Sequence, residues 1–183
     1  ILYGLLNDSE DTVCERVFAP LDDMESLMRK HQIPLFSLET YTPLREFDII
    51  GFSIQYELSY TNILNMLNLS GIPVRASERS EAAPLIIAGG PAAISPEPMA
   101  DFIDIFFVGD GEDCLPQFVT LWKEMKRTNL SRKEKMVSVA RTLKNAYVPS
   151  LFDVTYGCDN TIQQIRPKID GLPPLIRSAS VED

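Results

Sequence analysis

Residues 85–112 read LIIAGGPAAISPEPMADFIDIFFVGDGE, and this stretch decides the fold. It contains two short apolar runs, residues 85–88 and 103–108, and each run stops at a glycine-rich turn. Continuous apolar runs are typical of parallel strands that are covered on both faces. Between the runs, Ser95 followed by Pro96 is a helix-start signal. The alternation predicts a doubly wound α/β sheet, in which ligands lie beyond the carboxyl ends of the strands.

The rest of the chain carries signals for further elements. Two more strands are expected at residues 12–19 and 48–54, because both runs are largely apolar. Residues 151–156 and 161–165, joined by a Gly-Cys-Asp-Asn turn, predict a β-hairpin, and residues from Asp170 onward predict a linker. Helices are expected at residues 1–7 and along residues 115–125. Two more should begin at capping boxes, one at Asp22 with Glu25 and one at Ser131 with Glu134. A further helix should end at Leu69, with Gly71 just beyond its end.

Composition limits the classes of function. The chain has 183 residues and a net charge of −9, which argues against nonspecific nucleic-acid binding because phosphate contacts need clustered Lys and Arg. No apolar stretch approaches the roughly 20 residues that span a bilayer, so no membrane partner is expected. The three cysteines, Cys14, Cys114 and Cys158, are isolated, which predicts neither a zinc site nor disulfides and favours a cytoplasmic setting. The single histidine, His31, is expected on the surface at a helix end.

The two glycine-rich turns are the candidate ligand site. Each turn alone could serve only to reverse the chain, but on adjacent strands the two converge on one crevice. Neither matches G-x-G-x-x-G or the Walker lysine motif, and an acidic turn is a poor phosphate cradle. A bulky, mostly neutral ligand with amide and hydroxyl groups fits better. The turn residues are Gly89, Gly90 and Pro91 in the first turn and Gly109, Asp110, Gly111 and Glu112 in the second.

These turns also carry a family resemblance. A strand ending in Gly-Gly-Pro, then Pro96-Glu97-Pro98, then a strand ending in Gly-Asp-Gly-Glu resembles the cobalamin-binding (B12-binding) domain that precedes radical SAM domains. Residues 13–20, 33–39 and 52–62 extend the likeness to one uncharacterised subfamily of cobalamin-type radical SAM proteins. The resemblance covers roughly residues 1–165. It implies a flavodoxin-like (Rossmann-like), mostly parallel sheet over residues 1–146, followed by a hairpin and linker over residues 147–183.

The resemblance also implies a ligand and a partner. Cobalamin would lie over the two glycine-rich turns together with Ser53 and Gln55, without a protein ligand to cobalt, because the Asp-x-His-x-x-Gly motif is absent. The Cys-x-x-x-Cys-x-x-Cys motif for an iron–sulfur cluster is absent as well. The 4Fe-4S cluster and S-adenosylmethionine are therefore expected in a radical SAM domain downstream of Asp183, and the chain itself is an accessory module without a complete catalytic site.

Two other functions stay open at this point. A degenerate Rossmann-like domain could retain the fold for structural or interaction purposes and bind no corrinoid. A response-regulator-like signalling domain is weaker, because no acidic cluster surrounds a candidate phosphoacceptor Asp.

The resemblance further implies that a first strand precedes Ile1. In the flavodoxin-like order 2-1-3-4-5, that strand lies between residues 12–19 and residues 48–54. Without it, those two segments could pair directly, the C-terminal hairpin could insert, or a second copy could add a strand. We expect self-association into a homodimer through a sheet edge, because bare strand edges recruit other strands.

Overall fold

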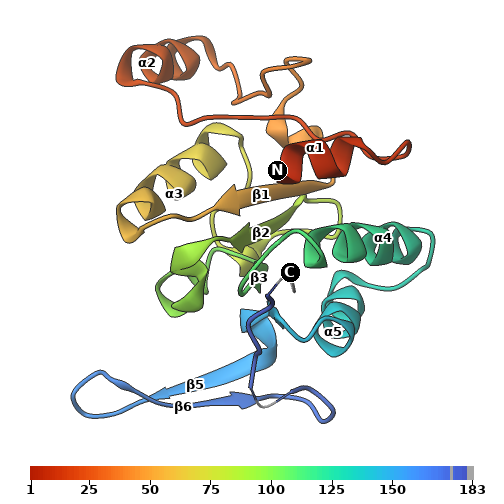
Figure 1. Cartoon of the computed structure of the whole chain (residues 1–183). Coiled ribbons are helices and arrows are strands. Elements are labelled where there is room, and N and C mark those ends of the chain that lie inside the picture. The colour runs from red at the N-terminus through yellow and green to blue at the C-terminus, as the bar shows by residue number, and fades with distance from the viewer. Residues whose placement is uncertain (174, 181–183) are drawn as a thin grey trace.

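The computed structural model of the chain describes residues 1–173 and 175–180 (Figure 1). Its helices are α1 (Leu2–Asn7), α2 (Asp22–His31), α3 (Tyr60–Leu69), α4 (Cys114–Lys126) and α5 (Arg132–Thr142). Its strands are β1 (Ile49–Ser53), β2 (Leu85–Gly89), β3 (Ile105–Phe107), β4 (Ala146–Tyr147), β5 (Phe152–Tyr156) and β6 (Ile162–Pro167). Among the described residues, no helix has the length and apolarity that a membrane crossing requires.

The strands form two sheets. The larger has the order β1-β2-β3-β4, in which β1, β2 and β3 run parallel and β4 is antiparallel to β3. Strands β5 and β6 form the separate antiparallel hairpin, which Figure 1 shows beyond the β4 edge and far from α2. The mixed α/β class, the mostly parallel sheet and the hairpin are thus confirmed. The sequence contains no signal that predicts the two-residue strand β4.

Burial follows the apolar runs that predict the strands. Residues 85–88 of β2 and all of β3 are buried, as parallel strands covered on both faces should be. Phe118, Trp122 and Met125 bury the inner stripe of α4. The helix-end signals at Gly71 and Ser131 are also confirmed. Gly71 has φ +68° just after α3, and Ser131 forms the full capping box with Glu134 at the start of α5.

The prediction of a strand at residues 12–19 is wrong. The segment is an extended connection without strand pairing. Its N–H groups at two positions donate to side chains: the Cys14 N–H donates to Asn7 Oδ1 at 2.8 Å, and the Arg16 N–H donates to Glu39 Oε2 at 2.7 Å. A strand needs a neighbour for its ladder, and none of the described segments takes that place.

The helix expected after Ser95 is also absent. Two short 3-10 helices, Pro91–Ile94 and Glu97–Met99, connect β2 to the segment before β3. The segment is also short, because only residues 96–102 separate Ser95 from the buried run that begins at Ile103, which leaves room for about two helical turns. The side chain of Ser95 caps neither short helix.

The capping box predicted at Asp22 is not formed. Asp22 is the first residue of α2, and Leu21 occupies the N-cap position without a side-chain bond. The Glu25 carboxylate accepts from Arg29 Nε at 2.8 Å and from Asn65 Nδ2 at 2.6 Å. A charge-assisted partner one helical turn away is stronger than the backbone amide that a capping box offers.

A buried carboxylate joins the sheet to its surroundings. Asp104 Oδ2 accepts from Arg79 Nη1 at 2.9 Å, from Arg132 Nη2 at 2.9 Å and from the Ile86 N–H at 2.8 Å. The Arg79 side chain is 0% exposed, and its other donors bind carbonyl oxygens of Pro73, Val74 and Phe102. Burial lowers the pKa of Arg79, and Asp104 opposes that shift by favouring the charged guanidinium.

We therefore expect Asp104→Ala to lower the free energy of unfolding by about 3–5 kcal/mol, because it leaves a buried guanidinium without its carboxylate. The matched control is Asp101→Ala, which removes an exposed ion pair with Arg75 and should cost at most about 1 kcal/mol. Urea denaturation of the two variants measures the difference. Equal losses would mean that the buried cluster contributes no more than a surface pair.

Candidate functional site

One large groove collects the predicted site residues. It has a volume of about 1380 Å³, above the roughly 300–1,000 Å³ of ordinary small-ligand pockets. Every predicted site residue lines it except Gln55, whose Nε2 donates to Ser53 Oγ at 3.0 Å from just outside. The prediction that the two glycine-rich turns share one crevice is therefore consistent with the structure.

The groove has two parts. The strand-end half lies at the carboxyl ends of the parallel strands, and the edge half lies along β1 between that strand and residues 12–17, with side chains of α1 and α4 beside them. The strand-end half is lined by Ser53, Gly89, Gly90, Pro91, Gly109, Asp110, Gly111, Glu112 and Ser178.

The first glycine-rich turn is fixed against the end of β1. The Ile54 N–H donates to the Gly89 carbonyl at 2.7 Å, and the Ala92 N–H donates to the Ile54 carbonyl at 3.0 Å. Gly90 has φ +97° and ψ 177°, a conformation that is essentially limited to glycine. A Cβ on Gly90 would lie 2.8 Å from the Ile54 carbonyl oxygen. Gly90 is thus required by the backbone itself, whereas a Cβ on Gly89 would meet only the Phe107 carbonyl at 3.6 Å.

The second turn is partly covered by the chain's own C-terminal segment. The Ala179 N–H donates to the Val108 carbonyl at 2.9 Å, and the Asp110 N–H donates to the Ala179 carbonyl at 3.0 Å. Gly109 has φ +94°, and a Cβ there would overlap the Ala179 carbonyl oxygen at 2.1 Å. The predicted linker therefore includes an ordered contact at residues 177–179, whereas Pro174 and residues 181–183 lie outside the described residues.

Two of the three free cysteines line the groove. Burial raises the pKa of the Cys114 thiol, which donates to the Asp110 carbonyl at 3.4 Å. Burial, followed by the carboxylates of Glu39 and Glu15, raises the pKa of Cys14. Both groups are therefore held as thiols at neutral pH, which is unfavourable for a nucleophile or a soft metal ligand.

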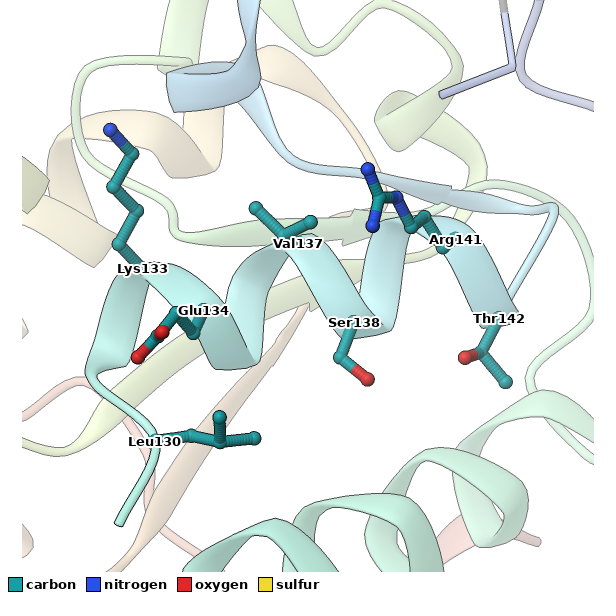
Figure 2. A pocket seen from close by; sticks show the side chains of 7 residues that line it. All are labelled: Leu130, Lys133, Glu134, Val137, Ser138, Arg141 and Thr142. Atoms are coloured by element: carbon teal, nitrogen blue, oxygen red, sulfur yellow. The ribbon is translucent and has the colours of Figure 1, made fainter. Parts of the chain in front are cut away.

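Other polar clusters do not form a competing site. No group of three or more His, Cys, Asp or Glu side chains within residues 1–173 and 175–180 is arranged to hold a metal ion. His31 is exposed as the last residue of α2 and does not line the groove. A second hollow has a volume of about 560 Å³. Figure 2 shows the side chains that line it, which come from α5, such as Lys133 and Arg141, and from Leu130 before the helix. Because one helix and its preceding loop supply all its lining residues, it contains no convergent polar groups from different elements.

Sequence reasoning missed two contributors to the groove. Leu2 of α1 lies against the second turn, with its side chain 3.3 Å from a Cβ position on Gly111. Residues 177–179 have a composition that is typical of a loop, which predicts only a linker. The tertiary contact with the end of β3 identifies them, and no local signal in the sequence could have done so.

The glycine geometry gives a direct test. Gly90→Ala should lower the free energy of unfolding by about 1–3 kcal/mol, because alanine disfavours this conformation and its Cβ would overlap the Ile54 carbonyl. Gly89→Ala is the matched control and should change stability far less. Thermal or urea unfolding measures both variants, and equal stability of the two would contradict the assigned backbone role of Gly90.

Comparison with known proteins places the chain in a family. Residues 1–149 match the family described as radical SAM proteins, N-terminal. An uncharacterized protein of Methanocaldococcus jannaschii is 28% identical over 88 residues, which are 48% of this chain and 18% of that protein. The chain thus aligns with less than a fifth of that relative's length. No solved structure matches the chain. Because the family match covers most of the sequence, the chain belongs to the N-terminal family of radical SAM proteins.

Proposed function

We propose that the chain is the accessory N-terminal module of a radical SAM protein and that it holds a corrinoid in the strand-end half of the groove. The observation that carries the proposal is the convergence of Ser53 and both glycine-rich turns on that half. The missing side chain at Gly89 lets a ligand approach the backbone, since a Cβ there would meet only the Phe107 carbonyl at 3.6 Å, whereas Leu2 packs beside Gly111. The family match supports the pairing with a radical SAM domain.

The chemistry of the lining fits cobalamin in a mode without a histidine ligand. The hydroxyl of Ser53 and the exposed backbone of the turns can bind the neutral amide groups of a corrinoid. The nearby acidic residues Asp110 and Glu112 disfavour a ligand that is mainly phosphate. The single histidine, His31, does not line the groove, so the protein would bind the corrin through its periphery.

A bound corrinoid would supply the reactivity of its cobalt, and the chain would hold the corrin ring in place. Its turns would orient the ring, and its buried wall would exclude water on one side. Residues 177–179 lie beside the second turn, because Ala179 bonds the backbone of Val108 and Asp110. A radical SAM domain that continues from this segment would begin next to the strand-end half. The 4Fe-4S cluster and S-adenosylmethionine would then be held by that domain.

Titration with hydroxocobalamin tests the proposal. The wild-type chain should co-elute with the corrinoid and shift its absorbance. Gly89→Leu should weaken binding about tenfold or more, a loss of at least about 1.4 kcal/mol, because it fills the strand-end half. The matched control is Gly4→Leu, since a Cβ on Gly4 meets nothing within 4 Å and Gly4 does not line the groove. Equal binding by both variants would contradict the assigned position of the ligand.

A second function has its own supporting observation. Gly90 and Gly109 are explained by contacts within the chain, with Ile54 and Ala179 respectively, and need no ligand. The alternative function is that of a module that packs against its neighbouring domain and binds no corrinoid. Such a module would need the same two glycines for the same reason. Wild-type protein that is folded but binds no hydroxocobalamin would favour this alternative.

A further inference from the structure

We propose that the edge half of the groove is the place of a β-strand parallel to β1, and that the polypeptide leading into Ile1 in the full-length protein supplies it. The inference concerns the edge half alone and does not depend on corrinoid binding in the strand-end half. It rests on the hydrogen-bonding groups of the two walls, on the residues that make up β1, and on the position of α1.

The first wall is the outer edge of β1. The Asp48 carbonyl accepts from Leu85, and the Ile54 N–H donates to Gly89, so these residues face β2. In a parallel strand the direction alternates from one residue to the next. Ile49, Gly51 and Ser53 therefore turn their N–H and C=O groups toward the groove, where no described group bonds them.

The opposite wall has the same alternation. The backbone N–H and C=O of Cys14 both form hydrogen bonds with the Asn7 side chain. The Arg16 N–H donates to Glu39, and the Arg16 C=O accepts from the Leu38 N–H. None of these four bonds involves a residue of β1. In an extended chain the alternate residues, Val13, Glu15 and Val17, then direct their backbone groups to the other side, and no described group bonds them. Two facing rows of unpaired backbone groups are what a strand inserted between them requires.

The composition of β1 is that of an interior strand. Edge strands are normally protected by lysine, proline, bulges or a covering element. The sequence Ile-Ile-Gly-Phe-Ser carries none of these residues, and Gly51 and Ser53 are exposed. Helix α1 is also incompletely covered, because its Leu2 and Leu6 line the groove but none of its residues is buried. A strand in the groove would cover both elements.

The position of α1 identifies the source of the strand. Lys123, near the C-terminal end of α4, contacts Asp11 and Thr12 at the start of residues 12–17. Lys126 contacts Asp48 at the start of β1. Both walls therefore begin at the same end of α4 and run in the same direction. Leu2 lies at the opposite end, beside Gly111. A strand parallel to β1 would therefore finish where Ile1 begins. Residues 1–11 would then form a helical crossover to residues 12–17, as neighbouring parallel strands need.

The other candidate occupants have less support. Residues 12–17 and β1 do not pair directly, and β5 and β6 are paired with each other beyond the β4 edge. A second copy would have to offer a free strand of its own, and among the described strands only β1 and the hairpin have open edges of that length. With an upstream strand, the order across the sheet would be residues 12–17, the new strand, β1 and β2. Numbered along the full chain, this is the order 2-1-3-4 of flavodoxin-like sheets.

Hydrogen exchange on the full-length protein tests the proposal. Amides of Gly51 and Ser53 should exchange on the order of a hundredfold more slowly than in an unstructured peptide, as should Val13 and Val17. A run of residues immediately upstream of Ile1 should be protected as well. If the groove is empty, only alternate amides of β1 should be protected, so that the Ile50 amide exchanges slowly and the Gly51 amide exchanges fast. That pattern, or a protected β1 edge with freely exchanging upstream residues, would overturn the proposal.

Two further measurements distinguish an upstream strand from a second copy and from an open edge. Light scattering at the same concentration should show that the protection exists in the monomer, and protection that disappears on dilution would assign the groove to a second copy. Gly51→Pro in the full-length protein should lower Tm and release the upstream amides, whereas Gly51→Ala should do neither, since its Cβ makes only ordinary contact with Ile87. An unchanged Tm for Gly51→Pro would overturn the proposal, because proline is tolerated on an open edge.

Discussion

The carboxylate of Asp104 connects three parts of the chain that are distant in sequence. It lies just before β3, and its Oδ2 binds the backbone of β2 at Ile86 together with the guanidinium groups of Arg79 and Arg132. These bonds set β3 beside β2, hold the loop that follows α3, and fix the start of α5. A charge buried in this way is tolerated only when all its partners are in place. This cluster fixes how β3 is aligned along β2. The relative position of the two glycine-rich turns, which follow these strands, therefore depends on it.

The sequence predicts those elements whose stability is local or fully apolar. Residues 85–88 are apolar without interruption and become the buried centre of the sheet, and the Ser131 capping box forms as expected. Residues 12–19 are largely apolar but interrupted by Glu15 and Arg16, and they form no strand, because a strand depends on a neighbour that its own sequence does not encode. The predicted helix after Ser95 is replaced by short 3-10 helices in the few residues that precede the buried run at Ile103. The contact of Ala179 with the second turn has no local signal at all.

The site follows the same division. The glycine-rich turns are identifiable from the sequence, and the structure brings them together with Ser53 in one groove. From the sequence, the glycines of either turn could serve to reverse the chain or to admit a ligand, and the structure shows that Gly90 and Gly109 are required by contacts with Ile54 and Ala179. Gly89 has no such backbone requirement and is the stronger indicator of a ligand, whereas the Leu2 side chain packs 3.3 Å from a Cβ position on Gly111. The edge half lies between residues 12–17 and β1, where the family resemblance implies a further strand, and the two segments face each other there without pairing.

If the strand-end half holds a corrinoid beside a radical SAM domain, as we propose, the intact protein contains cobalt as well as iron. Its cobalt and iron contents can be measured together after purification under anaerobic conditions. We expect one cobalt per chain alongside the iron of the cluster. Folded protein that contains its iron but no cobalt, even after incubation with hydroxocobalamin, would contradict the proposal.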